Sequence, residues 1–327
     1  MIELLLCTLI WGASFIAQKT GADHFGPFSI NCYRNLLAAV FLCGCIQLRD
    51  RFVGRVRREV GATRIHSGWT RTTAVGGALS GLCLFAAMLT QQIGIESTSP
   101  GVAAFLTANY VLLVPIFGIV LGHRAGWGVW GGVALAILGT YFICFSSCSL
   151  IPDPCSLGSG EAWTLLCAAL FAVQILVVDR FARDCDMLRF SMVQMMVAGL
   201  VALPFVFLPS ELARASWAGF VKGVPALVWL GIFSSGIAYT LQNLGQAKVP
   251  AALASIIMSL EGVFAVLFGW LILGDVLTVR QLLGCALVFS AVILSQLCTV
   301  KSAPGPVAEP RENMIQFKKF TIKGKSR

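Results

Sequence analysis

The chain has 327 residues, of which 57% are hydrophobic and only 12% charged, and its mean hydropathy is +0.83. Soluble domains carry about twice this share of charged residues, which argues against a soluble enzyme, a nucleic-acid-binding protein and a disordered protein. The net charge of +9 comes mainly from two basic clusters, one in 49–71 and one in the C-terminal tail. Since the apolar stretches are about as long as a bilayer is thick, we predict an all-α polytopic membrane protein.

Ten apolar segments are long enough to cross the bilayer as helices. In chain order they are predicted at 2–20, 28–48, 73–93, 100–122, 126–145, 161–181, 188–209, 224–245, 250–273 and 278–298. The first lacks the basic start and the cleavage site of a signal peptide, so we interpret it as a helix. Nineteen Lys and Arg residues fall on the side of the N-terminus and four on the other. This asymmetry predicts a multi-pass protein of the cell (plasma or inner) membrane with both termini cytoplasmic.

The second half of the chain repeats the first. Offsets of 150, 152 and 156 residues align polar, Gly and Pro positions inside otherwise apolar spans; they pair Gln92 with Gln242, Pro100 with Pro250, Gly122 with Gly274, Phe15 with Phe171 and Gln18 with Gln174. Each half holds five spans, an odd number, so the second half must enter the membrane inverted. Inverted repeats are typical of secondary transporters.

The predicted organisation is a first five-helix repeat at 1–146, an outer connecting loop at 147–160, a second repeat at 161–298 and a basic cytoplasmic tail at 299–327. Cys148 and Cys155 fall in the predicted outer loop. They either form a disulfide or stay as two free thiols, and spacing does not choose between these alternatives.

Several short motifs, found in order, resemble those of the EamA-type members of the drug/metabolite transporter superfamily. They are Trp11-Gly12-Ala13-Ser14-Phe15, Arg34, the Tyr110–Pro115 segment, Glu261-Gly262-Val263-Phe264-Ala265 and Leu273-Gly274-Asp275. Gly262 stands where the family usually has Pro, and Asp275 where it usually has Glu. The resemblance implies ten helices in two inverted repeats around a central cavity. It also implies carriage of small metabolites, commonly amino acids or their relatives, and often export.

Polar and aromatic side chains inside the spans are the candidate substrate-binding or cavity-lining residues. Amides can bridge helices or bind the amino and carboxylate groups of a ligand, and aromatic rings can contact an organic substrate. The candidates are Trp11, Ser14, Gln18, Gln92, Asn109, Tyr110, Gln174, Tyr239, Gln242 and Asn243. For each of them a packing, interfacial or gating role is the alternative interpretation.

Glu261 lies about eleven residues into its span, near the middle of the bilayer. A carboxylate there must face a cavity or a partner, or stay protonated. Three interpretations are open: proton coupling, direct binding of a substrate amine, and a neutral acid that bonds a neighbouring helix. Asn109, its predicted counterpart in the first repeat, cannot titrate, so a coupling role would belong to one half only.

Arg34 lies about six residues into the second span from the outer side, and it is the only base embedded in a span. Its side chain either extends to the membrane interface or contacts a carboxylate or another anion in the outer vestibule. A single base disfavours a strongly anionic cargo such as a nucleotide sugar.

Reactive constellations are absent from the sequence. The three His residues fall in or beside loops, which gives no metal site, and there is no Walker A motif or catalytic pair. We therefore expect no enzyme activity, cofactor, metal or nucleic-acid partner, while the oligomeric state stays open. The predicted function is secondary transport of small organic metabolites by alternating access through a central cavity, with export as the expected direction. A membrane-embedded enzyme acting on lipid and a passive channel are the alternatives.

Overall fold

The structure, a computed structural model, describes residues 1–60, 69–97, 100–122, 126–144, 158–273 and 278–301. Every regular element in these ranges is a helix, which confirms the predicted class. Cys148, Cys155 and the tail beyond Lys301 lie outside the described residues. The elements are α1 (Ile2–Ala22), α2 (Pro27–Val60), α3 (Arg71–Ser97), α4 (Pro100–Ala108), α5 (Tyr110–Val120), α6 (Trp127–Cys144), α7 (Ser159–Phe181), α8 (Met187–Ala202), η2 (Leu203–Phe207), α9 (Pro209–Leu212), α10 (Trp217–Val228), η3 (Trp229–Ala238), α11 (Tyr239–Gln246), α12 (Ala251–Met258), α13 (Leu260–Phe268), η4 (Gly269–Leu273) and α14 (Val279–Lys301).

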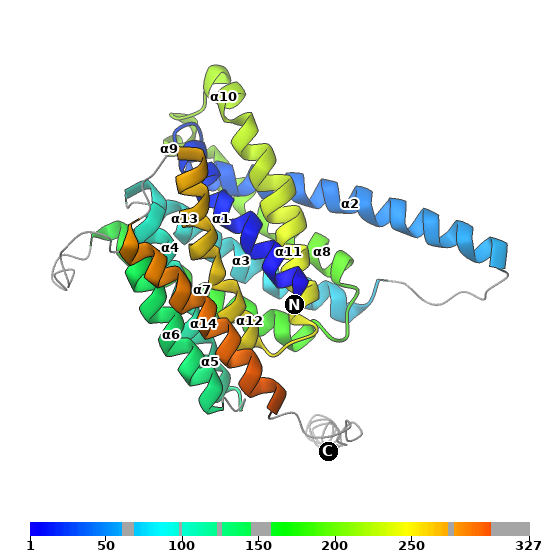
Figure 1. Cartoon of the computed structure of the whole chain (residues 1–327). Coiled ribbons are helices and arrows are strands. Elements are labelled where there is room, and N and C mark those ends of the chain that lie inside the picture. Colours follow the sequence, from blue (N-terminus) through cyan, green and yellow to red (C-terminus); the bar gives the residue numbers. More distant parts are fainter. Residues whose placement is uncertain (61–68, 98–99, 123–125, 145–157, 274–277, 302–327) are drawn as a thin grey trace, which may run out of the picture.

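Helices of this kind satisfy the backbone hydrogen bonds within each segment, which a bilayer demands. Six of them are long and apolar enough to cross a membrane, namely Ile2–Ala22, Arg71–Ser97, Ser159–Phe181, Met187–Phe207, Trp217–Gln246 and Ala251–Ile272. Shorter apolar helices cover Leu106–Val120, Trp127–Phe142 and Val279–Ser295. The predicted span 28–48 lies in α2, which continues to Val60 and projects away from the other helices (Figure 1). The helix is longer than the predicted apolar span because the polar segment after 48 contains no proline and stays helical.

Helices of the two halves pack directly on each other. α3 packs against α7 and α8, α2 against α8, and α1 against α13, while α6 packs against α14. The largest buried apolar cluster draws its side chains from both halves, for example Leu4, Leu84, Met195 and Ile257. The interior of the molecule therefore lies between the two predicted repeats.

Two predicted spans are interrupted helices. The span 100–122 is built from α4 and α5, which meet at Asn109, and 250–273 contains α12 and α13, which meet at Ser259. Both residues keep near-helical angles, with φ −63° and ψ −10° at Asn109 and φ −62° and ψ −13° at Ser259. These breaks lie at the 150-residue offset of the repeat. At this offset Asn109 aligns with Ser259, whereas the predicted counterpart of Asn109 is Glu261, two residues further along the chain.

The helix that runs from Trp217 to Gln246 widens into a π-helix, η3, in its middle. Gly231 and Gly236 let this segment approach α2 closely, because added Cβ atoms would lie 2.7 Å from Leu37 Cδ2 and 2.9 Å from Phe41 Cδ1. π-helical turns occur often at functional sites. Here the turn brings Ser234 and Ser235 against α2.

α1 crosses α13 at Gly12, and this contact gives a stability prediction. A Cβ on Gly12 would lie 2.5 Å from Phe264 Cβ and 2.7 Å from the Phe264 carbonyl carbon, so the helices would have to separate. We expect Gly12→Ala to lower the free energy of unfolding by about 1–3 kcal/mol, as overpacking does. Thermal unfolding in detergent, followed by tryptophan fluorescence, measures the change.

Gly44→Ala is the matched control, because an added Cβ on Gly44 meets nothing within 4 Å. Gly44 lies in helix α2, where alanine is favoured over glycine by about 0.5–1 kcal/mol. We therefore expect this variant to unfold at the same or a higher temperature. A Gly12→Ala protein as stable as the Gly44→Ala protein would contradict the described crossing of α1 and α13.

We name the two ends of the bundle by α1: the proximal face is where α1 begins and the distal face is where it ends. At the proximal face, Asp186 accepts two hydrogen bonds from Arg49, at 2.9 and 2.7 Å, and one from Arg189 Nη1 at 2.8 Å. Partial burial raises the pKa of Asp186, but hydrogen bonds from Arg49 outweigh it and hold this pKa below its ordinary value. Arg189 also bonds Asp50. This cluster joins α2 to α8.

At the distal face, Glu211 caps α2 from another part of the chain. Its carboxylate accepts hydrogen bonds from the backbone N–H groups of Phe28, at 3.2 Å, and Ser29, at 2.9 Å. A carboxylate at this position accepts hydrogen bonds from backbone N–H groups that have no partner within the helix. Its negative charge also interacts favourably with the positive end of the helix dipole. α2, which carries Arg34, is thus held at both ends of its span.

Candidate functional site

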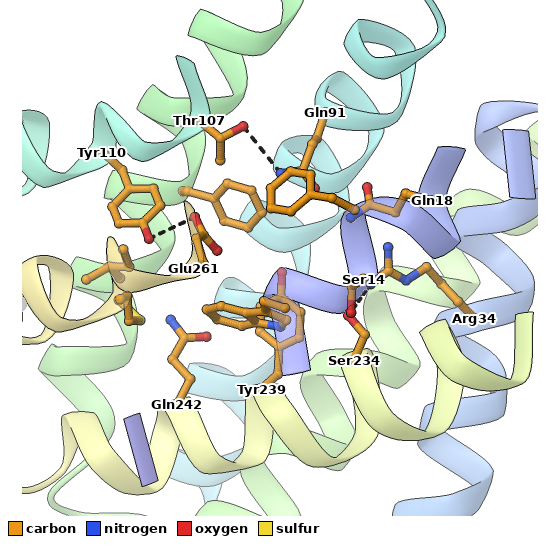
Figure 2. A pocket seen from close by; sticks show the side chains of 15 residues that line it. Ser14, Gln18, Arg34, Gln91, Thr107, Tyr110, Ser234, Tyr239, Gln242 and Glu261 are labelled. Atoms are coloured by element: carbon orange, nitrogen blue, oxygen red, sulfur yellow. Dashed lines mark hydrogen bonds between the residues drawn. The ribbon is translucent and has the colours of Figure 1, made fainter. Parts of the chain in front are cut away.

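A cavity of about 30 Å³ lies in the middle of the bundle, between the two predicted repeats. α1 and α13 contribute to its wall, together with α2, α7 and the η3–α11 segment (Figure 2). This volume accommodates about two water molecules. An organic ligand would therefore require the lining side chains to move apart.

Glu261 supplies a carboxyl group to the cavity from the first turn of α13, directly after the break at Ser259. It is 5% exposed, and its Oε1 accepts a hydrogen bond of 3.0 Å from the Tyr110 hydroxyl (Figure 2). Tyr110 in turn directly follows the other break, at Asn109. Among the described residues Glu261 has no ion-pair partner. A carboxyl group at this depth needs a proton, a cation or a positively charged ligand.

Arg34 lies on the opposite side of the cavity (Figure 2). It is 3% exposed, and its Nε and Nη2 donate hydrogen bonds of 3.0 Å each to Ser235 Oγ and Ser234 Oγ. Two hydroxyl groups of the π-helical turn thus hold the Arg34 side chain inside the bundle, and its contact with an anion stays a prediction. Within the described ranges no carboxylate forms an ion pair with it.

Aromatic rings and amides complete the polar part of the wall. The rings of Trp11 and Tyr239 lie 4.8 Å apart, and Ser14 Oγ accepts a hydrogen bond of 3.2 Å from Trp229 Nε1. The donor Trp11 Nε1 and the acceptor oxygens of two cavity amides are buried without a hydrogen-bond partner in the described part of the chain. Such groups are costly unless a ligand or water satisfies them. The wall can thus both donate hydrogen bonds to a ligand and accept them from it.

The structure brings eight of the twelve predicted site residues together around this cavity. They are Trp11, Ser14, Gln18, Arg34, Tyr110, Tyr239, Gln242 and Glu261. Four others do not line it: Gln92, Asn109, Gln174 and Asn243.

Three of these four residues connect helices around the cavity. Gln92 Nε2 donates to the backbone oxygen of Gln18 at 3.4 Å, and Gln174 Oε1 accepts from Gln242 Nε2 at 3.3 Å. Asn243 Nδ2 donates to oxygens of α8 at 2.8 Å. The Asn109 amide instead bonds the backbone oxygen of Leu106, one turn before it.

Sequence reasoning missed seven lining residues: Phe15, Gln91, Thr107, Phe171, Ile175, Ser234 and Met258. The repeat contained a signal for two of them, since Phe15 and Phe171 are a repeat pair. Gln91 takes the place predicted for Gln92, because one residue turns a helical side chain by about 100°. The apolar members carry no polar signal that would separate them from packing residues.

Metal chemistry finds no support in the described residues. They contain no group of three His, Cys, Asp or Glu side chains that could hold a metal ion.

The chain is similar to known membrane transporters over nearly its whole length. The model of the EamA-like transporter family matches residues 1–145 and 158–297. An uncharacterized transporter of Archaeoglobus fulgidus is 26% identical over 297 residues, covering 90% of this chain and 85% of the relative. The threonine/homoserine exporter RhtA of Escherichia coli is 25% identical over 216 residues, covering 64% and 67%.

Two further similarities extend over more of the chain. The uncharacterized inner membrane transporter YedA of Escherichia coli is 24% identical and covers 92% of both chains. A crystal structure superimposes with a TM-score of 0.69 and 18% identity, covering 93% of this chain and 98% of the other, which supports the fold. The chain therefore belongs to the EamA-like transporter family, within the drug/metabolite transporter superfamily of multi-pass membrane proteins.

Proposed function

We propose that this protein is a secondary transporter that moves small amino-acid-like metabolites across the membrane. The observation that carries the proposal is the pairing of opposite charges in one cavity: Glu261 lies on one side and Arg34 on the other, and neither has a counter-ion among the described residues (Figure 2). A zwitterion complements both groups at once, with its ammonium near Glu261 and its carboxylate near Arg34.

The remainder of the wall supports a small organic cargo. The rings of Phe15, Trp11 and Tyr239 offer apolar and aromatic surface, while Gln18 and Gln242 offer amides. The similarity to RhtA, whose name gives threonine and homoserine as its cargo and export as its direction, favours amino-acid-like substrates and export. A strongly anionic cargo is disfavoured, because Arg34 is the only base among the described residues of the cavity wall.

We further propose alternating access between the two predicted repeats, with the proximal face in the cytoplasm. The Lys and Arg asymmetry supports this orientation. Two amide pairs lie in related places: Gln92 bonds Gln18 between α3 and α1, and Gln242 bonds Gln174 between α11 and α7. The predicted repeat relates Gln18 to Gln174 and Gln92 to Gln242, so the two pairs are equivalent in the two halves. On this proposal, breaking one pair opens one side of the cavity while the other side stays closed.

The experiment that tests the proposal is counterflow in proteoliposomes that contain the purified full-length chain. The vesicles are preloaded in turn with amino acids, with amines that lack a carboxylate, and with carboxylates that lack an amine. We expect saturable uptake of labelled amino acid into amino-acid-loaded vesicles, and much weaker uptake into vesicles loaded with amines or with carboxylates. Uptake that rises linearly with concentration and needs no internal cargo would identify a passive channel. Absence of exchange for every amino acid, in folded protein, would contradict the proposed substrate class.

A further inference from the structure

A second cavity lies outside the transport site, between α5 and α7 near the proximal face. Its volume is about 980 Å³, the upper end of the usual range for ligand sites. Apolar side chains form its walls, namely Phe117, Val120, Leu121, Val173, Leu176 and Val177. Val120 is 83% exposed, although it belongs to an apolar helix that has no need of water contact. The cavity is therefore a groove that faces the hydrocarbon of the bilayer.

The proximal end of this groove is charged. Arg180 lies in the last turn of α7, and Arg183 and Asp184 follow in the connection to α8, where all three are exposed. The Arg180 guanidinium carbon lies 5.9 Å from the centre of the Phe181 ring, which also lines the groove. Among the described residues these three side chains form no ion pair with each other.

This arrangement of charges fits a ligand that carries both a negative and a positive group. Arg180 and Arg183 line the same end of the groove, and guanidinium groups bind phosphate oxygens through paired hydrogen bonds. Asp184 adds a carboxylate beside them, and the half-buried Asp179 adds a second inside the groove. A headgroup with only a negative charge would meet the exposed carboxylate of Asp184, whereas a headgroup with a phosphate and a primary amine satisfies both signs.

We propose that the α5–α7 groove binds one phospholipid of the ethanolamine type from the leaflet at the proximal face. One acyl chain lies along Val173 and Leu176, Arg180 and Arg183 hold the phosphate, and the primary amine donates hydrogen bonds to Asp184. A choline headgroup presents no N–H donor to the carboxylate, and a glycerol headgroup presents no cation. The site is independent of the transport cavity, which lies deeper in the bundle.

The test is native mass spectrometry of the full-length chain in non-ionic detergent. The protein is titrated with phosphatidylethanolamine, phosphatidylcholine and phosphatidylglycerol that carry the same acyl chains. We expect the first ethanolamine lipid to bind at least about tenfold more tightly than the other two, as charged hydrogen bonds to a headgroup allow. Arg180→Gln/Arg183→Gln should weaken the binding of all three lipids, because each of them carries a phosphate. Asp184→Asn should lower the affinity for the ethanolamine lipid to that for the choline lipid.

Two further variants keep the result interpretable. Arg51→Gln changes another exposed arginine, in α2, and should leave the preference intact. Val173→Trp fills the groove without touching the charges, so it should weaken the binding of all three lipids. Equal affinities for the three lipids in the unmodified protein or a preference for the glycerol lipid would overturn the proposal. So would a preference that survives Asp184→Asn, or lipid binding that Arg180→Gln/Arg183→Gln leaves unchanged.

Discussion

Replacing Glu261 with glutamine is expected to abolish uptake driven by a pH gradient. The variant keeps the volume of the side chain and the hydrogen bond from the Tyr110 hydroxyl, which is 3.0 Å from Glu261 Oε1. It removes the titratable carboxyl group from the cavity, so the site can neither exchange a proton nor compensate the charge of a substrate ammonium. Flux of labelled amino acid into proteoliposomes, with and without an imposed pH difference, measures the effect.

Counterflow at equal pH then separates the two roles that Glu261 can have. If it carries only the coupling proton, Glu261→Gln keeps counterflow with an unchanged half-saturating concentration. If it binds the substrate ammonium, that concentration rises by at least about 30-fold, since losing one member of a buried charge pair costs about 2–5 kcal/mol. Glu96→Gln, which alters an ion pair with Arg214 at the distal face, is the control. Unchanged pH-driven flux would leave Glu261 with a structural role only.

The pH dependence of transport near neutrality should originate in the cavity rather than in the ionic cluster at the proximal face. Hydrogen bonds from Arg49 and Arg189 hold the pKa of Asp186 below its ordinary value despite partial burial. A carboxyl group with a lowered pKa stabilises the fold while it is ionised, and it loses this contribution only as the pH falls through that pKa. Asp186 therefore keeps its charge, and its contacts with Arg49, at physiological pH.

The helices were predictable because the bilayer demands long apolar segments, but their interruptions were not. Apolar residues continue on both sides of Asn109 and Ser259, and both residues keep near-helical angles. The breaks depend on how α4–α5 and α12–α13 pack in the folded protein. Similarly, the π-helical turn at Trp229–Ala238 depends on the close approach of Gly231 to α2.

The candidate site was predictable to the extent that polar residues are rare in apolar spans. This rule found Glu261, Gln18 and Gln242, which line the cavity. It did not separate Gln91 from Gln92, because the two amides are neighbours in sequence and point to different sides of α3. It also gave no sign of the two serine partners of Arg34, which are about 200 residues away in sequence. Contacts between residues so far apart in the sequence leave no local sequence pattern.

Replacing Arg34 should change the selectivity for carboxylates. If the Arg34 guanidinium binds the substrate carboxylate, Arg34→Gln should raise the half-saturating concentration of an amino acid by at least about 30-fold. The corresponding amine, which lacks the carboxylate, gains nothing from the guanidinium, so its weaker exchange should stay nearly unchanged. Competition of amino acid and amine for counterflow, measured in the same vesicles, gives both values.

Two variants separate carboxylate binding from support of the fold. Arg34→Lys keeps the positive charge but loses the planar fork, so amino-acid counterflow should weaken less than in Arg34→Gln. Ser234→Ala removes one hydrogen bond, of 3.0 Å, from Arg34 Nη2 and leaves the charge in place. We expect it to raise the half-saturating concentration by no more than about tenfold. If Arg34→Gln weakened the exchange of amine and amino acid equally and also lowered the unfolding temperature, Arg34 would bind only η3, and the carboxylate of the cargo would have to bind elsewhere in the cavity.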